Sequence, residues 1–282
     1  MSLIVSVTSI SSRLPVLRHT LISLLDQHCK PDRIVLLLSK EPYLMDDGVN
    51  ELPPWLDAMV ARRDIELQWV ENTGPYRKLM PLYRTATDDD VIVTCDDDVI
   101  YGPEWLSSLM QTAKAHPNAI VCGRARRPAK NPLGRRKSYL IWQVVPLGSS
   151  GPDLLPIGIA GVVYRKPLLD PGIMLSDDYK TLAPKQDDLW FDLARKISGV
   201  DLYVSLEANK YVYPIKTTSA LWKANASFAV SKRDGWVLTL FHKFIIRVQA
   251  YSGMDVCEND IVIGRLAEYA KSFSQIGSSA LR

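Results

Sequence analysis

The sequence has few cysteines and histidines, and neither type is spaced as a metal site. Its four cysteines are far apart and include no C-x-x-C pair, so the usual zinc spacing is absent. Cys95 and Cys122 each end an apolar run, and we expect both to be buried, reduced thiols. Of the four histidines, only His19 and His28 lie near one another. The sequence therefore predicts no histidine-rich metal site and no need for an oxidising compartment.

Long apolar runs are also missing. No stretch of about 18 apolar residues is present, so we expect no membrane-spanning helix. Residues 1–13 lack a basic region followed by a long apolar region, so we expect no signal peptide. These absences predict a protein that is cytoplasmic, or peripheral at the inner face of the membrane.

Charge of one sign does not dominate either. The 282 residues include 34 basic and 31 acidic side chains, a balance that does not indicate nucleic-acid binding. The hydrophobic share of 47% is that of a folded globular protein. Basic residues are concentrated in residues 124–137, with seven Lys or Arg and no acid. This segment is either a solvated loop or one that meets phosphate or an acidic membrane.

Apolar strand patterns alternate with helical patterns through the first 125 residues. We expect strands over residues 3–10, 33–39, 65–70, 90–95 and 119–124, and helices over 15–27, 53–63, 77–87 and 103–115. The alternation predicts an α/β fold with a mainly parallel sheet that is covered on both faces. Ligands of such sheets bind at the carboxyl ends of the strands.

The later elements are less regular, and Pro and Gly recur between them. We expect strands over 157–166 and 201–206, and helices over 186–199 and 235–251. The predicted domains are residues 1–225, with a nucleotide-binding half (1–125) and an acceptor half (126–225), and a C-terminal helical extension, 226–282.

Three consecutive carboxylates follow the strand expected over residues 90–95. Alternate side chains of an extended chain point the same way, so Asp96 and Asp98 can share a site while Asp97 points elsewhere. Carboxylate oxygens that leave coordination positions open suit Mg²⁺ or Mn²⁺ holding a diphosphate. An acidic surface turn is the plainer interpretation, but the apolar strand before the run and the helix start after it favour a ligand site.

Other segments also allow two interpretations. Asp187 and Asp188 open a predicted helix, where acids stabilise the first turn by about a few tenths of a kcal/mol, or where one of them serves as a general base. Lys78 enters a helix at the end where cations oppose the dipole, which favours a phosphate or carboxylate partner over a solvated role. Gly158 and Gly161 allow either close approach of a ligand or tight packing.

The order of these segments carries a family resemblance. The stretches VTSISSR, TGPYRKLMP, VTCDDDVIYGPEWL, GIAGVVY and QDDLWFDLA follow one another along the chain. Over about residues 3–225 the sequence resembles nucleotide-sugar glycosyltransferases of the GT-A fold, close to bacterial family-2 enzymes that build surface polysaccharide. The resemblance implies a Rossmann-like, mostly parallel central sheet flanked by helices.

The resemblance also implies residue roles on the donor side. Asp98 would bind Mn²⁺ or Mg²⁺ in a D-x-D motif, and Asp96 would contact the metal or the ribose. The donor nucleotide would be held by Thr8, Arg13, Lys78, Asp96 and Asp97. Relatives often supply a later histidine as a metal ligand. His242 lies in the tail that the resemblance does not cover, so the third ligand stays open.

On the acceptor side, the resemblance places Gly158 and Gly161 at the donor sugar and acceptor. It makes Asp188 the catalytic base beside Asp187, where relatives often have Glu. The implied reaction moves a sugar from a nucleoside-diphosphate sugar, with UDP favoured, to a hydroxyl of a glycan or lipid-linked acceptor. Inversion at the anomeric carbon is expected, and retention is the alternative.

Two other classes of function compete with transfer. A sugar nucleotidyltransferase normally has a Gly-rich loop after its first strand, and residues 8–15 contain no glycine. A non-catalytic carbohydrate-binding scaffold is the other alternative. Separately, residues 235–251 mix apolar residues with Lys243 and Arg247, which predicts either a core helix or one that lies on an anionic bilayer.

Overall fold

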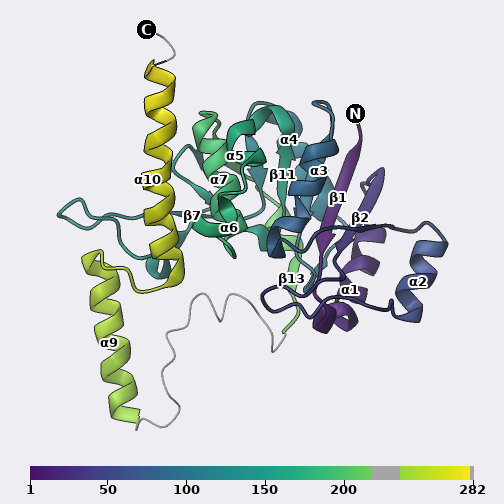
Figure 1. Ribbon diagram of the computed structural model, residues 1–282, viewed down its shortest axis with the longest axis horizontal. Coiled ribbons are helices and arrows are strands. Elements are labelled where there is room, and N and C mark those ends of the chain that lie inside the picture. The colour runs from purple at the N-terminus through teal and green to yellow at the C-terminus, as the bar shows by residue number, and fades with distance from the viewer. Residues whose placement is uncertain (217–235, 280–282) are drawn as a thin grey trace. The chain divides into compact units, whose positions relative to one another are not determined.

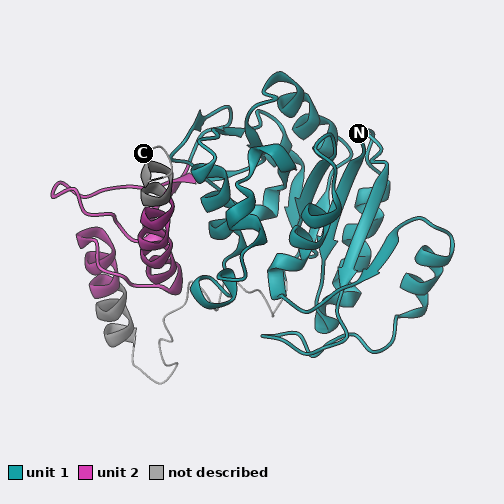
Figure 2. Cartoon of the chain, turned by 45° about the horizontal axis from the view of Figure 1, so that its top comes forward, with its two compact units in different colours: residues 1–125, 145–216 teal, residues 126–144, 217–282 magenta. Residues whose placement is uncertain are grey.

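The computed structural model describes residues 1–216 and 236–279 (Figure 1), and the side chains of 236–243 and 274–279 are not among those described. The chain forms two compact units (Figure 2). Unit 1 comprises residues 1–125 and 145–216, and unit 2 comprises residues 126–144 and 217–282. The domain boundary expected at residue 225 lies outside the described residues.

Unit 1 is built on an eight-stranded sheet in the order β3-β2-β1-β4-β11-β6-β12-β9. The strands are β1 (Leu3–Thr8), β2 (Arg33–Leu38), β3 (Glu66–Trp69), β4 (Val91–Cys95), β6 (Ile120–Cys122), β9 (Ser150–Gly151), β11 (Val162–Arg165) and β12 (Leu202–Val204). β1 pairs in parallel with β2 and β4, and β11 runs antiparallel between β4 and β6. The α/β class with a mainly parallel sheet is therefore confirmed.

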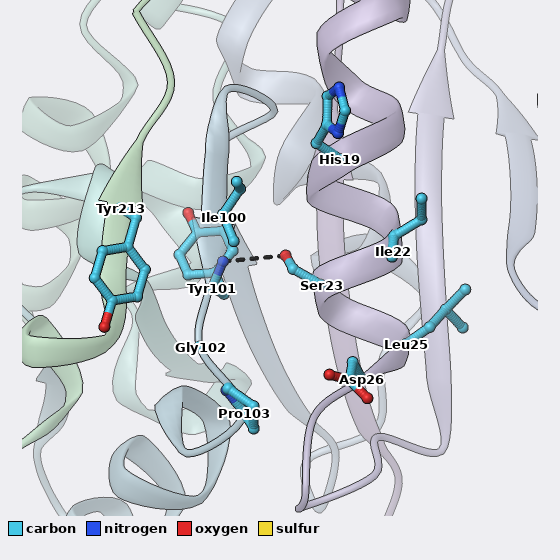
Figure 3. Close-up of a pocket in the computed structure, with 10 residues that line it drawn as sticks. All are labelled: His19, Ile22, Ser23, Leu25, Asp26, Ile100, Tyr101, Gly102, Pro103 and Tyr213. Atoms are coloured by element: carbon cyan, nitrogen blue, oxygen red, sulfur yellow. Dashed lines mark hydrogen bonds between the residues drawn. The ribbon is translucent and has the colours of Figure 1, made fainter.

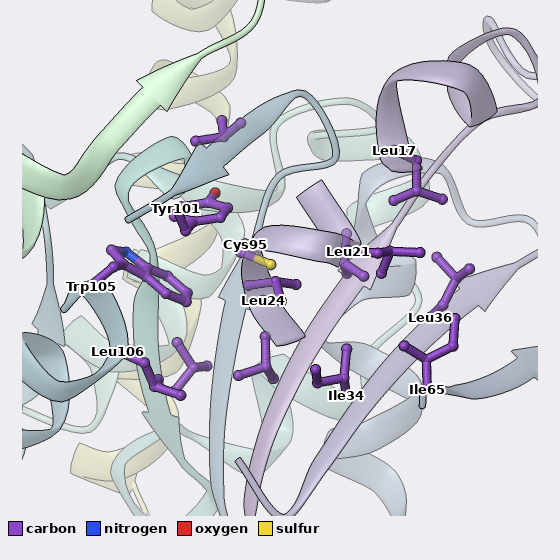
Figure 4. Packing of buried hydrophobic residues seen from close by; sticks show 14 of the residues in the cluster. Leu17, Leu21, Leu24, Ile34, Leu36, Ile65, Cys95, Tyr101, Trp105 and Leu106 are labelled. Atoms are coloured by element: carbon purple, nitrogen blue, oxygen red, sulfur yellow. The ribbon is translucent and has the colours of Figure 1, made fainter. Parts of the chain in front are cut away.

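Helices cover both faces of this sheet. They are α1 (Leu14–Leu25), α2 (Pro54–Ala61), α3 (Met80–Thr85), α4 (Trp105–Ala115), α5 (Pro171–Leu175), α6 (Tyr179–Leu182) and α7 (Asp187–Ile197). Figure 4 shows Leu17, Leu21 and Leu24 of α1 packed near strand side chains such as Leu36. The spacing of those leucines places them on one face of the helix, which is why the sequence pattern located α1 correctly.

Short elements connect the larger ones. They are the strands β5 (Val99–Tyr101), β10 (Leu155–Pro156) and β13 (Val212–Pro214), and the 3-10 helices η1 (Ser11–Arg13), η2 (Gly74–Lys78), η4 (Gly158–Ala160), η5 (Lys166–Leu168) and η6 (Ala208–Tyr211). β5 and β13 pair antiparallel and form a separate two-stranded sheet. We did not predict either strand, because three residues carry too little periodicity.

Two expected elements begin later than predicted. The helix expected over residues 77–87 starts with η2, and α3 begins at Met80 with Pro81 in its first turn. The strand expected over residues 157–166 starts with η4, and β11 begins only at Val162. The reason is Gly161, whose φ of +86° ends the 3-10 turn in a conformation that strands do not use.

Unit 2 combines a basic loop with two helices. Its elements are β7 (Ala125–Arg127), which begins at the last residue of unit 1's first segment, η3 (Tyr139–Ile141), β8 (Gln143–Val144), α9 (Trp236–Ser252) and α10 (Glu258–Ser279). The helix expected over residues 235–251 corresponds to α9. Among the helices of the described ranges, none has the length and hydropathy needed to cross a membrane.

Candidate active site

The three consecutive aspartates separate as soon as β4 ends. Asp97 turns inward, and its two oxygens accept hydrogen bonds from Ser9 Oγ at 2.5 Å and Arg13 Nη1 at 2.8 Å. Asp96 and Asp98 are more accessible, with 33% and 17% of their side-chain surface exposed. Both Asp97 oxygens thus accept hydrogen bonds from the protein itself. The contact between Asp97 and the donor nucleotide, which the family resemblance implies, stays a prediction.

Burial and mutual repulsion act on this acidic run. Burial raises the pKa of Asp97, although the charge of Arg13 opposes the shift. Burial, followed by the charge of Asp97, raises the pKa of Asp98 to about 6. A cation beside Asp98 would offset the repulsion and lower that pKa again.

The two residues near the end of β1 that were predicted to bind the nucleotide, Thr8 and Arg13, both make contacts within the protein. Thr8 Oγ1 donates a hydrogen bond to the carbonyl of Leu37 on β2 at 2.8 Å. Arg13 is buried, and its Nη1 lies 2.8 Å from Asp97 and 3.7 Å from Asp98. Both side chains therefore contact the protein itself, and their contact with the donor nucleotide stays a prediction.

Lys78 connects the two acidic segments of the chain. Its buried ammonium lies 2.8 Å from Asp187 Oδ2, 3.5 Å from Asp96 Oδ1 and 4.0 Å from Asp188 Oδ1. Burial alone would lower the pKa of Lys78, but the charges of Asp187, Asp96 and Asp188 raise it well above its ordinary value. Three separate segments that the sequence had singled out thus meet at one cation.

Asp188 has the surroundings of a general base. Its Oδ2 accepts a hydrogen bond from the backbone N–H of Gly158 at 3.0 Å, whereas its Oδ1 accepts none from the described residues. Burial, followed by the charge of Asp187, raises the pKa of Asp188 to about 7, and Lys78 opposes the rise. A carboxyl group with a pKa near neutrality suits proton transfer at physiological pH.

The two glycines singled out from the sequence have different surroundings. A Cβ on Gly158 would lie 2.9 Å from Asp188 Oδ1 and 3.1 Å from Lys78 Nζ. A Cβ on Gly161 would lie 2.4 Å from the ring of Trp105. Gly158 therefore borders the acidic site, whereas Gly161 allows close packing, and its contact with a sugar stays a prediction.

Tyr101 links the two sides of the site, and sequence reasoning missed it. Its hydroxyl accepts a hydrogen bond from the N–H of Asp96 and donates one to the carbonyl of Ile159, both at 3.0 Å. Trp105 Nε1 adds a bond to the carbonyl of Ala160 at 2.9 Å. The only signal in the sequence was the position of Tyr101 five residues after Asp96.

A buried ion pair that the sequence did not reveal holds η2 in place. Arg77 Nη2 lies 3.0 Å from Asp46 Oδ2, and both side chains are almost fully buried. The same nitrogen donates a hydrogen bond to the carbonyl of Ser9 at 3.1 Å. Arg77 therefore fixes the segment that carries Lys78 against the end of β1.

The carboxylates after β4 fit a hard divalent cation. Asp96 and Asp98 carry the carboxylate oxygens that Mg²⁺ and Mn²⁺ prefer as ligands. A nearby positive charge would stabilise the ionised form of Asp98, whose pKa is raised. Within residues 1–216 and 236–279, no three His, Cys, Asp or Glu side chains come together as a complete metal site. The remaining ligands would have to come from substrate and water, and the side chain of His242 lies outside those described.

An open pocket of about 650 Å³ lies elsewhere on unit 1, along α1, β5 and β13 (Figure 3). Ile22, Ile100 and Tyr213 give it an apolar lining, and Ser23 Oγ accepts a hydrogen bond from the N–H of Tyr101 at 3.0 Å. None of the residues predicted to bind substrate lines this pocket. The residues predicted to bind substrate therefore lie away from this pocket, and several of them are at the carboxyl end of β4.

Comparison with known proteins decides the family. The family model described as glycosyl transferase family 2 matches residues 7–166, more than half of the chain. The chain belongs to glycosyl transferase family 2. It is a glycosyltransferase, and unit 1 has the GT-A fold, in agreement with the resemblance seen in the sequence.

Several solved structures are similar to this family 2 chain at low identity. Residues 1–349 of TarS from S. aureus are 14% identical, with 100% of this chain and 75% of that chain covered and a TM-score of 0.48. The same fragment in complex with UDP-GlcNAc is 15% identical, with 100% and 76% covered and a TM-score of 0.49. A further TarS structure is 14% identical, with 89% and 44% covered and a TM-score of 0.46. No curated protein matches the chain.

The family match covers only part of the candidate site. It includes the donor-side residues and both glycines, while Asp187 and Asp188 follow its end at residue 166. Lys78, inside the matched range, makes the ion pair of 2.8 Å that joins Asp187 to the rest of the site.

Proposed function

We propose that this family 2 enzyme moves a sugar from a nucleoside-diphosphate sugar to an acceptor hydroxyl, with inversion at the anomeric carbon. One observation carries the proposal: Asp188, with a pKa of about 7, lies beside Lys78 and Asp96 at the carboxyl end of β4. This edge is where open α/β sheets bind their ligands.

Asp188 acts on the acceptor in this proposal. The acceptor hydroxyl gives its proton to the Asp188 carboxylate, and its oxygen forms a bond to the anomeric carbon. The bond from that carbon to the diphosphate oxygen breaks, and its electron pair leaves with the nucleoside diphosphate. Attack from the face opposite the leaving group inverts the configuration. The N–H of Gly158 orients the base through Oδ2.

Asp98 and Asp96 would hold Mn²⁺ or Mg²⁺, which would supply neutralising charge to the diphosphate. Lys78 favours the ionised form of Asp188, because its charge opposes the rise in the pKa of that group. Arg13 and Asp97 hold the loop that carries the metal-binding carboxylates.

The donor and acceptor classes follow from the family resemblance. We favour a UDP-sugar as donor, and a glycan or lipid-linked acceptor in surface polysaccharide synthesis. Membership of a glycosyltransferase family argues against the two alternatives, a sugar nucleotidyltransferase and a non-catalytic scaffold.

A panel of nucleotide sugars that includes UDP-GlcNAc tests the proposal. We expect one donor to bind and to be hydrolysed slowly with Mn²⁺ or Mg²⁺, and Asp98→Asn to abolish both. Absence of metal-dependent binding to every donor would mean that the three aspartates form only a structural turn. Retention of anomeric configuration in the product, measured by NMR, would contradict the role of Asp188.

A further inference from the structure

Positive charge is concentrated in unit 2. Its two segments contain 14 basic and 5 acidic residues, a net charge of +9, whereas unit 1 contains 20 basic and 26 acidic residues, a net charge of −6. The overall charge of +3 hides this asymmetry. A strongly basic unit in a chain whose other unit is acidic indicates an anionic partner for the basic unit.

The loop between β7 and β8 presents much of this charge to solvent. Arg127, Lys130 and Arg135 are exposed, and none of them forms an ion pair with a residue that the structure describes. Leu133 lies between two of them and is 81% exposed. Arg136 is the exception, since its Nη2 lies 3.3 Å from Asp255. The loop therefore offers unneutralised cations together with an exposed leucine.

One side of α9 is apolar and exposed. Phe244, Val248 and Tyr251 are 63%, 51% and 45% exposed. Spacings of four and three residues place them on one face of the helix. Arg247, also exposed, lies beside them. Much of this face is therefore open to solvent in the described structure, although burying these groups would be favourable.

Direct contacts join the loop to the end of α9. Asn131 Nδ2 donates a hydrogen bond to the carbonyl of Ser252 at 2.9 Å, and the N–H of Ser138 donates to the carbonyl of Ala250 at 3.0 Å. The ammonium of Lys137 lies 4.9 Å from the centre of the Tyr251 ring. Cations and apolar side chains thus belong to one part of unit 2. We name it the basic–apolar surface, formed by Lys130, Leu133, Arg135, Phe244, Val248 and Tyr251.

We propose that the basic–apolar surface binds the face of a bilayer rich in anionic phospholipids. The cations would pair with lipid phosphates, and the apolar side chains of α9 and Leu133 would enter the headgroup boundary. A nucleic acid would use the cations but leave Phe244 and Val248 in water. A second copy of the chain would bring two units of +9 together, which repulsion opposes. The proposal is independent of the proposed function.

Co-sedimentation of the full chain with vesicles tests this proposal. One set of vesicles is phosphatidylcholine alone, and the other is phosphatidylcholine and phosphatidylglycerol in equal parts. We expect binding to the anionic vesicles only, and weakening as salt rises. Lys130→Glu with Arg135→Glu should weaken it at least about tenfold. Phe244→Glu with Val248→Glu should do the same, because charged groups would replace the inserted side chains.

Matched changes on unit 1 serve as controls. Lys114→Glu and Leu175→Glu alter an exposed cation and an exposed apolar side chain, and both should leave vesicle binding unchanged. No binding to anionic vesicles, or binding that survives both double variants, would overturn the proposal. Light scattering tests whether a second copy of the chain covers α9 instead. If the chain does not bind vesicles but forms a dimer, and Phe244→Glu with Val248→Glu dissociates that dimer, a second copy covers α9 and the proposal is overturned.

Discussion

At the scale of single residues, the site depends on one buried cation among carboxylates. Lys78 is the only cation within 4.0 Å of Asp96, Asp187 or Asp188 among the residues described, and it contacts all three. Its charge permits Asp187 and Asp188 to stay near one another in a buried place, where unpaired charges cost several kcal/mol. Changes to these residues should therefore affect both the protonation of Asp188 and the stability of the folded protein.

Asp188→Asn should separate catalysis from stability. We expect kcat to fall about 10²–10⁴-fold, because the base is lost. The pKa of Asp188 is about 7 in the folded protein against an ordinary value of 3.8, so the wild type loses stability as pH rises from about 4 to 7. Above pH 7 the variant should therefore be more stable, with a Tm higher by about 2–4 °C in thermal unfolding.

Asp57→Asn is the matched control, since Asp57 is exposed on α2. It should change neither kcat nor the melting temperature appreciably. A Tm of Asp188→Asn that falls at pH 8 would contradict the raised pKa, and an unchanged kcat would remove Asp188 from the mechanism.

The pH dependence of kcat/KM should report the same group. Only the ionised carboxylate accepts a proton, so kcat/KM should rise with pH and level off above about 7. Lys78→Met removes the charge that opposes the rise in the pKa of Asp188, and the midpoint should move upward by about one pH unit. Lys78→Arg keeps the charge and should leave the midpoint near that of the wild type. An unmoved midpoint in Lys78→Met would mean that another group titrates.

At the scale of elements, η4 and the loop after β4 act as one assembly. The hydroxyl of Tyr101 bonds to both of them, and the backbone N–H of Gly158 in η4 holds Asp188 at the start of α7. The placement of Asp96 relative to Asp188 therefore depends on short turns rather than on the long strands.

Gly158→Ala should impair catalysis without unfolding the protein. Its Cβ would lie 2.9 Å from Asp188 Oδ1, closer than van der Waals contact allows, so the carboxylate must shift. Since φ at Gly158 is not positive, alanine adopts the backbone conformation without strain. We expect kcat to fall about 10²-fold, as misplacement near 1 Å does elsewhere.

The control is Gly264→Ala in α10, where nothing lies within 4 Å of the added Cβ. It should leave kcat unchanged and raise stability slightly, because alanine is the better helix former. Full activity of Gly158→Ala would show that the enzyme does not need the observed approach of η4 to Asp188.

Tyr101→Phe should loosen the link between the two sides of the site. Without the hydroxyl, the N–H of Asp96 loses an acceptor and the carbonyl of Ile159 loses a donor, both in partly buried surroundings. We expect the free energy of unfolding to fall by about 1–3 kcal/mol in urea titrations. Tyr213→Phe removes a hydroxyl from an exposed tyrosine, and a loss of similar size there would contradict this account.

At the scale of the whole molecule, the chain passes from unit 1 into unit 2 at residue 126 and returns at residue 145. Within unit 2, buried Asp260 ties the loop between β7 and β8 to α10. Its carboxylate accepts bonds from Ser138 Oγ at 2.6 Å and from the N–H of Tyr139 at 2.7 Å. The backbone N–H of Val256 bonds to it at 3.0 Å. A single carboxylate thus accepts bonds both from the loop and from the segment before α10.

Asp260→Ala should therefore open unit 2 selectively. Several buried donors lose their acceptor, each at a cost of about 1–3 kcal/mol. We expect limited proteolysis to cut within residues 126–144 at least about tenfold faster, with donor hydrolysis by unit 1 retained. Asp255→Ala removes an exposed carboxylate and should leave the cleavage rate unchanged. Equal loss of donor hydrolysis and loop protection would show that the units unfold together.

Local pattern in the sequence was enough to predict the class of fold and the family. The apolar runs of β1, β2 and β4 and the leucine spacing of α1 each extend over several residues. These patterns therefore predicted the elements without tertiary information. The order of the D-D-D run, Lys78 and the Asp187–Asp188 pair was enough for the family resemblance that the match over residues 7–166 confirmed.

Only the tertiary structure decided which contacts each of those residues makes and how deeply each is buried. The local sequence does not distinguish Asp97, which is buried and paired with Arg13, from its two neighbours. Nor does the local sequence place Tyr101 between Asp96 and Ile159. The same holds for the grouping of residues 126–144 with the C-terminal segment, which gathers the charge of +9 in one unit. The physical reason is that burial, ion pairing and pKa depend on groups distant in sequence, and their distances exist only after folding.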